Sequence, residues 1–217
     1  MKASAAGIAP TLVVFAKEPA PGRVKTRLAA AIGAQSAADV YRELTAGTLA
    51  HAAAARDAGI VRAVELWCTP DADAPYFRQV AAAAGAQRRS QCDGDLGARM
   101  AHAIADVLAR RPRVLLIGTD CPVLDAQRLA AAAEMLDDFD AVLGPAEDGG
   151  YVLVGATRPL PLGDVRWSTP HALADTIAGF THAGIRYATT PALWDVDEPA
   201  DLARWETLRR GAMRAAR

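Results

Sequence analysis

The residue best placed for chemistry is Asp120, the carboxylate in the segment GTDCP at residues 118–122. It follows the apolar run of residues 114–117, and a proline two positions later stops the strand from continuing. Ligand sites in open α/β sheets lie at the carboxyl ends of the strands, so we expect Asp120 to face a site rather than the core. The alternative is a turn or helix-cap residue, which is the usual role of a lone aspartate after an apolar run.

A cluster of cations follows the first apolar run. Lys17, Arg23, Lys25 and Arg27 lie close together on a loop shaped by prolines and glycine that leads into a helix. Such a loop can present charged side chains and backbone N–H groups to one polyanion, and phosphates usually dock on the first strand-to-helix loop of nucleotide-binding α/β domains. The alternative is an exposed basic turn. The loop is neither a Walker A sequence nor GxGxxG, so ATPase and hydride-transfer functions have no motif support.

Two further carboxylates, Asp195 and Asp197, lie in the segment WDVDEP near the end of the chain. They are two residues apart, so they point the same way if the chain is extended. One of them can join Asp120 on Mg²⁺ or Mn²⁺, because oxygen ligands from two strands plus phosphate oxygens are a usual arrangement around magnesium. Which of the two binds stays open, and helix capping by Asp197 or Glu198 is the alternative.

Three other segments can contribute to a site. The consecutive glycines of EDGGY, at residues 147–151, permit positive φ and a close approach of ligand to backbone, although a simple hairpin turn is the alternative. Residues 91–100 can supply an anion or base contact, and residues 167–170 place an aromatic side chain and two hydroxyls before a helix. Both segments more often cap helices. The four histidines have no metal-ligand spacing.

Apolar runs alternate with amphipathic segments along the whole chain. Strands are predicted at residues 11–16, 61–68, 113–118, 141–143, 151–154 and 186–190. Helices are predicted at residues 35–56, 75–84, 96–110, 125–136, 170–183 and 199–210, with Asp125 as an N-cap. This alternation predicts an α/β fold, a single Rossmann-like domain with a mainly parallel sheet and helices on both faces. The domain is expected at residues 11–210, between a flexible N-terminus (1–10) and a C-terminal tail (211–217).

Composition and net charge exclude several classes of function and partner. The chain has 217 residues, 52% of them hydrophobic, which fits one compact domain. Its 24 basic and 25 acidic residues argue against nucleic acid or an anionic membrane as partners. The apolar runs are too short to span a bilayer and the N-terminus lacks a signal-like core, so a cytoplasmic protein is expected, and a homodimer is possible. Three widely spaced cysteines indicate neither a disulfide framework nor a structural zinc site.

The order of these motifs resembles that of a known bacterial family. The motifs are FAK at residues 15–17, PGRVKTRL at 21–28, GTDCP at 118–122, DGGY at 148–151 and DVDEP at 195–199. Together, over residues 11–208, they resemble the rSAM/selenodomain-associated transferase 1 family, also termed glycosyltransferase A-like. That family has the GT-A, or nucleotide-diphospho-sugar transferase, fold, and its superfamily includes phospholactate guanylyltransferase and the molybdenum-cofactor nucleotidylyltransferases.

The resemblance implies four groups of site residues. The catalytic residues are Lys25, Arg27 and Asp120. Nucleotide binding is implied for Phe15, Ala16, Lys17, Gly22, Arg23, Lys25, Thr26, Arg27 and Thr119. Acceptor binding is implied for Asp148, Gly149, Gly150, Tyr151 and Trp167. Metal binding is implied for Asp120 with a carboxylate from the pair Asp195 and Asp197.

The resemblance also implies a transferase that takes a nucleoside triphosphate or a nucleotide-sugar together with a small acceptor. Glycosyltransferases of this fold usually hold metal with Asp-x-Asp, but Gly118 stands two residues before Asp120. A single Asp followed by x-Pro is similar to the nucleotidyltransferase branch, and KTRL at residues 25–28 resembles the Lys-Ser-Arg-Leu of the guanylyltransferases. We therefore expect in-line attack by an acceptor phosphate or hydroxyl on the α-phosphorus, with pyrophosphate stabilised by the cations. Glycosyl transfer is the alternative, and a non-catalytic nucleotide-binding protein is the minor one.

Overall fold

The computed structural model describes residues 7–215. Residues 1–6 of the expected N-terminus (1–10) and residues 216–217 of the expected tail (211–217) lie outside the described part. The strands are β1 (Thr11–Lys17), β2 (Ala63–Thr69), β3 (Gln87–Ser90), β4 (Val114–Ile117), β5 (Ala141–Pro145), β6 (Tyr151–Ala156) and β7 (Tyr187–Thr189). The helices are α1 (Thr26–Ile32), α2 (Ala34–Asp57), α3 (Pro75–Ala84), α4 (Leu96–Leu108), α5 (Ala126–Met135), α6 (Ala172–His182) and α7 (Pro199–Ala215).

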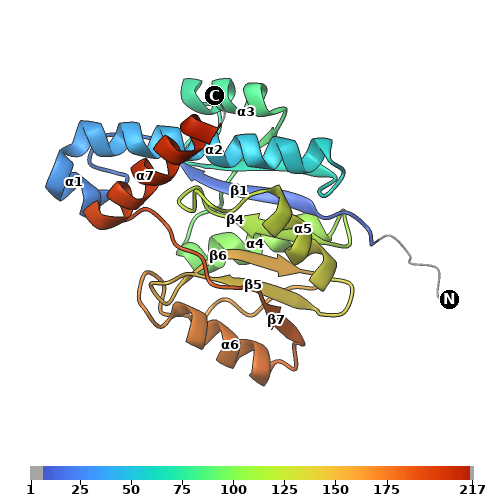
Figure 1. Ribbon diagram of the computed structural model, residues 1–217. Coiled ribbons are helices and arrows are strands. Elements are labelled where there is room, and N and C mark those ends of the chain that lie inside the picture. Colours follow the sequence, from blue (N-terminus) through green and yellow to red (C-terminus); the bar gives the residue numbers. More distant parts are fainter. Residues whose placement is uncertain (1–6, 216–217) are drawn as a thin grey trace.

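The strands form one sheet in the order β3-β2-β1-β4-β6-β5-β7 (Figure 1). Only β6 runs against its neighbours, β4 and β5; the other named pairs are parallel. The turn between β5 and β6 carries the two consecutive glycines, so this segment is a hairpin. The predicted single α/β domain with a mainly parallel sheet is confirmed.

Helices cover both faces of the sheet. Leu12 and Val14 of β1 pack in the cluster that includes residues of α2, α3 and α5, whereas Val13 packs in the cluster that includes residues of α4 and α6. In Figure 1 the strands are stacked from β1 above to β7 below, with α2 and α3 near β1 and α6 near β5 and β7. A strand buried on both faces needs apolar side chains at every position, which is why β1 reads as a continuous apolar run.

Three elements differ from the expectation. β3 was missed because its sequence, QRRS, is polar and mostly exposed, so it has neither an apolar run nor an alternation. A second helix, α1, precedes α2, and Gly33 at φ 88° separates the two. The last helix continues to residue 215, past the predicted end at 210. The predicted N-cap is confirmed, because Asp125 accepts a hydrogen bond from the backbone N–H of Arg128 at 3.0 Å.

The connections create a crevice beside the carboxyl ends of β1 and β4. From β1 the chain moves outward through β2 to β3, and it then returns to the other side of β1 as β4. The loops after β1 and β4 therefore leave in opposite directions, which is the topological switch point where ligands bind in open α/β sheets.

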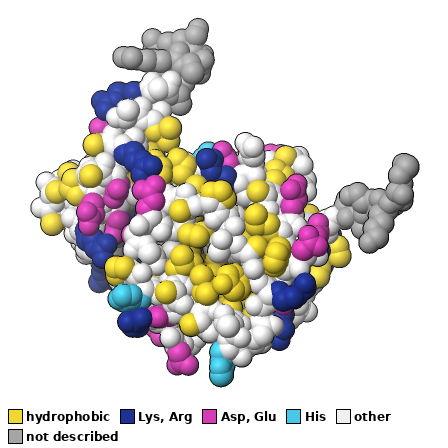
Figure 2. Space-filling model, turned by 60° about the horizontal axis from the view of Figure 1, so that its bottom comes forward, with side chains coloured by type: hydrophobic (Ala, Val, Ile, Leu, Met, Phe, Trp, Pro, Cys, Tyr) yellow, Lys and Arg dark blue, Asp and Glu magenta, His cyan; other side chains and the backbone are white. Residues whose placement is uncertain are grey.

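The remaining expectations concern cysteines and membrane spans. Cys68, Cys92 and Cys121 are free thiols. Among residues 7–215, no helix combines the length and the apolar character that crossing a membrane requires. Figure 2 shows a face on which yellow side chains, a class that includes alanine and proline, are surrounded by scattered charges of both signs.

Candidate active site

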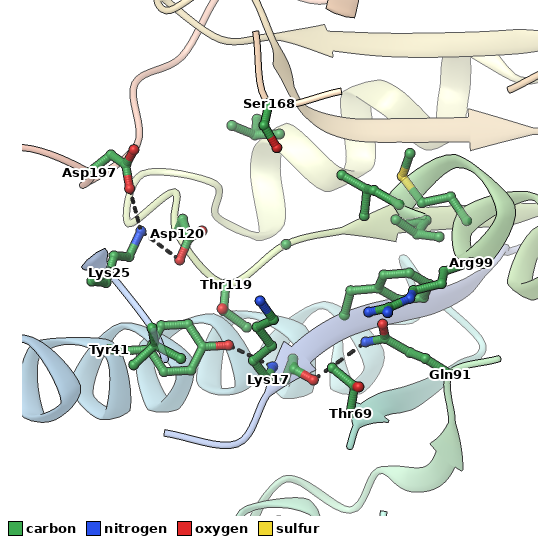
Figure 3. A pocket seen from close by; sticks show the side chains of 18 of the residues that line it. Lys17, Lys25, Tyr41, Thr69, Gln91, Arg99, Thr119, Asp120, Ser168 and Asp197 are labelled. Atoms are coloured by element: carbon green, nitrogen blue, oxygen red, sulfur yellow. Dashed lines mark hydrogen bonds and ion pairs between the residues drawn. The ribbon is translucent and has the colours of Figure 1, made fainter. Parts of the chain in front are cut away.

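A cavity of about 730 Å³ opens at the switch point (Figure 3). The end of β1, the loop that follows it, the end of β4 and the beginning of α4 border it together with part of β6. Eight of the nine predicted nucleotide-binding residues line this cavity: Phe15, Ala16, Lys17, Arg23, Lys25, Thr26, Arg27 and Thr119. Gly22 is not among the lining residues; it is exposed in the loop, at φ 78°. The loop and the β4 end thus meet in one cavity.

The other predicted residues divide between the cavity and its surroundings. Asp120 and Asp197 line the cavity, but Asp195 does not. Tyr151 lines it as well, and so does Ser168, which the sequence analysis considered only as part of a helix-capping segment. The lining does not include four of the predicted acceptor residues: Asp148, Gly149, Gly150 and Trp167.

Lys25 is the buried cation of the site. Its side chain is 3% exposed, and its Nζ lies 2.9 Å from Asp120 Oδ1 and 3.8 Å from Asp197 Oδ1. The backbone of Lys25 is left-handed, with φ 48° and ψ 48°, immediately before the first turn of α1. Figure 3 shows the Lys25 side chain pointing between the two carboxylates. Its ammonium therefore joins the loop after β1 to the segments after β4 and before α7.

The second ion pair joins Arg27 to Asp197. Arg27 Nη1 donates to Asp197 Oδ2 at 2.9 Å, and both side chains are partly exposed. The alternative role of Asp197 as a helix cap is not seen. Instead, Asp201 accepts hydrogen bonds from the backbone N–H groups of Asp197 and Glu198, at 3.1 and 2.8 Å. Two of the four loop cations are thus paired with the carboxylates predicted to bind metal.

The carboxylates suit a divalent cation, although they do not form a closed protein site. Within the described residues, no group of three or more His, Cys, Asp or Glu side chains could hold a metal ion. Asp120 Oδ1 is buried and makes no hydrogen bond of normal geometry, despite its short contact with the Lys25 ammonium. A buried carboxylate oxygen without a hydrogen bond is a suitable ligand for Mg²⁺ or Mn²⁺, and Asp197 and phosphate oxygens could complete the coordination.

Asp195 is partly buried and does not line the cavity. The backbone N–H of the next residue, Val196, donates to the carbonyl oxygen of Asp120 at 3.0 Å, which holds the segment before α7 against the end of β4. Burial, together with the negative charges of Asp148 and Asp120, raises the pKa of Asp195 to about 6 against the opposing effect of Lys25. Asp195 is therefore a carboxyl that can exchange a proton near neutral pH.

Tyr41 of α2 fixes the end of β1 and was missed by the sequence analysis. Its hydroxyl oxygen accepts a hydrogen bond from the backbone N–H of Lys17 at 2.8 Å. Burial, together with the charge of Asp120, raises the pKa of Tyr41 well above its ordinary value, so the phenol stays neutral. The only available signal was its place on the same helical face as Leu44 and Thr48.

Gln91 and Arg99 form the opposite end of the cavity (Figure 3). Gln91 Nε2 donates to the carbonyl oxygens of Trp67, at 2.8 Å, and Ala16, at 3.4 Å. No donor from the described part of the chain reaches Gln91 Oε1, which can therefore accept a hydrogen bond from a ligand. Arg99 Nε donates to the carbonyl oxygen of Gly94 at 2.9 Å, and no partner for the two terminal guanidinium nitrogens lies within the described residues. This end offers an acceptor and several donors to the edge of a planar polar ligand.

Trp167 supports the cavity wall from behind. Its ring packs edge-on against Tyr151, with centroids 5.9 Å apart, and a Cβ added to Gly97 would lie 2.5 Å from Trp167 Nε1. Within the described residues, neither Tyr151 Oη nor Trp167 Nε1 has a hydrogen-bond partner, although both atoms are buried. Burial raises the pKa of Tyr151 above its ordinary value, so its hydroxyl remains a neutral donor.

The hairpin turn between β5 and β6 packs against the segment that precedes α6. Gly149 has φ 90°, and a Cβ at this position would lie 2.3 Å from the carbonyl oxygen of Pro170. The glycine is required by this close approach and by its backbone conformation. Asp148 accepts a hydrogen bond from the backbone N–H of Gly150 at 2.9 Å, which closes the turn. These residues shape the hairpin, and their predicted role in acceptor binding stays a prediction.

Solved structures share this fold. A protein from Desulfovibrio desulfuricans G20, provisionally named a nucleotide-diphospho-sugar transferase, is 29% identical with a TM-score of 0.76, over 87% of this chain and 82% of that chain. A nucleotidyl transferase from Methanothermobacter thermautotroptrophicus is 16% identical with a TM-score of 0.61, over 96% of this chain and 100% of that chain. Glucosyl-3-phosphoglycerate synthase from Mycobacterium tuberculosis, solved with Mn²⁺, UDP and glucosyl-3-phosphoglycerate, is 13% identical with a TM-score of 0.58, over 91% of this chain and 75% of that chain.

Sequence comparison identifies the family more directly. No curated protein matches this chain in sequence. The profile of the DUF2064 family, described as "uncharacterized protein conserved in bacteria", matches residues 48–169. The resemblance to the rSAM/selenodomain-associated transferase 1 family stays a prediction beside this broader assignment. With more than half of its length matched by that profile, the chain belongs to the DUF2064 family and has the GT-A-like fold of nucleotidyltransferases and sugar transferases.

Proposed function

We propose that this protein is a Mg²⁺-dependent or Mn²⁺-dependent nucleotidyltransferase. It would transfer a nucleotidyl group from a nucleoside triphosphate to a small acceptor that carries a phosphate or a hydroxyl. The observation that carries the proposal is the single cavity in which the cationic loop after β1 meets Asp120 and Asp197. Cations beside carboxylates at a topological switch point suit a polyphosphate accompanied by a divalent cation.

The two ends of the cavity suggest how a nucleotide would lie. Gln91 and Arg99 would bind the edge of the base, because they supply one acceptor and several donors. The phosphates would extend past Lys17 toward Lys25 and Asp120, which lie at the opposite end in Figure 3. Lys17 and Arg23 are exposed in the cavity, and no ion pair engages either of them within the described residues, so both are free to contact phosphate oxygens.

Transfer would proceed by in-line attack. An acceptor oxygen forms a bond to the α-phosphorus while the bond from that phosphorus to the bridging oxygen of the β-phosphate breaks, and pyrophosphate leaves. Lys17, Arg23, Lys25 and Arg27 would stabilise the negative charge that develops on the leaving group. A divalent cation held by Asp120 and Asp197 would neutralise the phosphates and help to orient them.

The acceptor would approach from the side of Tyr151 and Ser168, which line the cavity on β6 and before α6. A phosphate acceptor needs no strong general base. A hydroxyl acceptor must lose its proton to a base within hydrogen-bond reach, and Asp195 does not line the cavity, so a phosphate acceptor fits the site better. Asp197 lines the cavity and contacts Lys25, which favours Asp197 over Asp195 as the metal ligand.

Glycosyl transfer from a nucleotide-sugar is the second candidate, and one observation favours it. Lys25 and Arg27 are already paired with carboxylates, which leaves fewer free cations for the three phosphates of a nucleoside triphosphate. A nucleotide-sugar has two phosphates, and its sugar would face the hairpin at Asp148 and Tyr151. In that case the leaving group would be a nucleoside diphosphate.

Thermal unfolding in the presence of candidate donors tests the choice. A ligand that binds the folded state raises the melting temperature according to its concentration relative to Kd. With Mg²⁺ present, we expect a nucleoside triphosphate to raise the melting temperature at lower concentration than any nucleotide-sugar. Tighter binding of a nucleotide-sugar would favour glycosyl transfer. Binding of a triphosphate without release of pyrophosphate, across phosphate and alcohol acceptors, would favour a non-catalytic binding protein.

A further inference from the structure

The ammonium of Lys25 lies where a divalent cation would have to bind. Its Nζ is 2.9 Å from Asp120 and 3.8 Å from Asp197, the two carboxylates proposed as metal ligands. The Lys25 side chain is 3% exposed, so solvent and salt screen this charge only weakly. A divalent cation and the ammonium cannot both occupy the space between these carboxylates, because like charges repel strongly at such distances.

The main chain directs this one lysine inward. A left-handed backbone is uncommon for a residue other than glycine, yet Lys25 adopts it at φ 48°. The Lys25 carbonyl oxygen accepts a hydrogen bond from the backbone N–H of Ala29 at 2.8 Å, which ties the residue to the first turn of α1. Thr26 and Arg27 are exposed, whereas Lys25 is buried. Backbone strain of this kind persists where the surrounding structure enforces it, often in ligand sites.

The negative charges of Asp120 and Asp197 are therefore already neutralised when no metal is bound. Lys25 neutralises Asp120, and Arg27 neutralises Asp197 at 2.9 Å. A metal ion alone would have to expel an ammonium whose ion pairs, within the described residues, are with Asp120 and Asp197 alone. A polyphosphate changes this balance, because its oxygens give the ammonium a new anionic partner within the same cavity.

We propose that Lys25 is the resident cation of the Asp120–Asp197 pair, and that a divalent cation enters together with a polyphosphate that draws Lys25 onto its oxygens. The inference rests on the proposed function, since it requires phosphates in this cavity. It makes metal binding and nucleotide binding mutually dependent. Lys25 thus excludes metal from the empty site and contacts phosphate in the filled one.

Binding of Mn²⁺ to the nucleotide-free protein tests the proposal, with the signal of free Mn²⁺ measured by electron paramagnetic resonance. Wild-type protein should bind Mn²⁺ weakly. Lys25→Met should tighten this binding about tenfold or more, because the competing buried charge is gone. Lys17→Met removes an exposed charge beside the same cavity, and it should change the affinity less than about twofold because that charge is screened.

A second variant at the same position is needed in case Lys25→Met does not fold, and circular dichroism would show whether each variant is folded. Lys25→Gly removes the ammonium and adopts the left-handed backbone without strain, so it should also bind Mn²⁺ more tightly than wild type. A non-hydrolysable nucleoside triphosphate should increase the Mn²⁺ affinity of wild type more than that of either variant. If both folded Lys25 variants bind nucleotide-free Mn²⁺ no more tightly than wild type, the proposal is overturned.

The outcome also separates this inference from the proposed function. Failure of wild-type protein to bind any nucleoside triphosphate with Mn²⁺ would remove the proposed function, and with it the role of phosphate in moving Lys25. Normal triphosphate binding by wild type, combined with unchanged Mn²⁺ affinity in the Lys25 variants, would overturn only the resident-cation role.

Discussion

Asp120→Asn separates the structural role of the carboxylate from its role in metal binding. The substitution keeps the shape of the side chain and removes the charge that lies 2.9 Å from the Lys25 ammonium. Breaking a fully buried ion pair costs about 3–5 kcal/mol. Here Asp197 remains 3.8 Å from the ammonium and the Asp120 side chain is 43% exposed. We therefore expect a smaller loss, roughly 1–2 kcal/mol in the free energy of unfolding.

The assay is thermal unfolding with and without a nucleoside triphosphate and Mg²⁺. For a domain of this size, 1 kcal/mol shifts the melting temperature by roughly 2–4 °C, so the free variant should melt roughly 2–8 °C below wild type. A ligand at a hundred times its Kd stabilises wild type by about 2.7 kcal/mol, and the Mg²⁺-dependent part of this gain should disappear in the variant.

Turnover should disappear together with that stabilisation. Asp57→Asn, which changes an exposed carboxylate at the end of α2 paired with Arg56, is the matched control and should leave both the fold and the Mg²⁺-dependent gain intact. An Asp120→Asn protein with the same Mg²⁺-dependent stabilisation as wild type would refute the assignment of Asp120 as a metal ligand.

Three further changes test other parts of the site. Arg27→Ala should weaken triphosphate binding about ten- to a hundredfold, as isothermal titration would measure, because it removes charged hydrogen bonds; unchanged affinity would make Arg27 a surface residue only. Gly149→Ala should lower the free energy of unfolding in urea by roughly 1–3 kcal/mol, since its Cβ would lie 2.3 Å from the Pro170 carbonyl oxygen, whereas Gly163→Ala, with open space around it, should change it little. Asp195→Asn should become more stable relative to wild type as the pH rises from about 4 to 6, because the raised pKa of Asp195 means that ionisation in this window costs the folded state stability. A difference of roughly 1 kcal/mol at pH 7 is expected after allowing for partial exposure, and a difference that does not vary with pH in urea unfolding would contradict the raised pKa.

The buried strands could be predicted because burial on both faces leaves an unmistakable sequence pattern. β1 and β4 read as continuous apolar runs, and each is followed by the polar residues that line the cavity. β3 has no such pattern, because an exposed edge strand is held by backbone hydrogen bonds that any residue can make. Hydrogen bonds between segments far apart in the sequence could not be predicted either. Tyr41 lies in an alanine-rich helix, and nothing in that helix indicates that the Tyr41 hydroxyl accepts a hydrogen bond from the backbone of Lys17.

The type and spacing of the charged residues predicted which segments border the candidate site, but not which carboxylate each cation pairs with. Four cations close together in sequence suggested one common role, yet the structure divides them. Lys17 and Arg23 are exposed in the cavity, Arg27 pairs with a carboxylate more than a hundred residues away, and Lys25 is buried against Asp120. The burial of Lys25 depends on its left-handed backbone. Nothing in the sequence of this proline-rich loop indicates that a lysine would adopt that uncommon conformation. Because a carboxylate competes with phosphate for the donors of a cation, the affinity of this loop for a nucleotide depends on which partner each side chain keeps when the nucleotide binds.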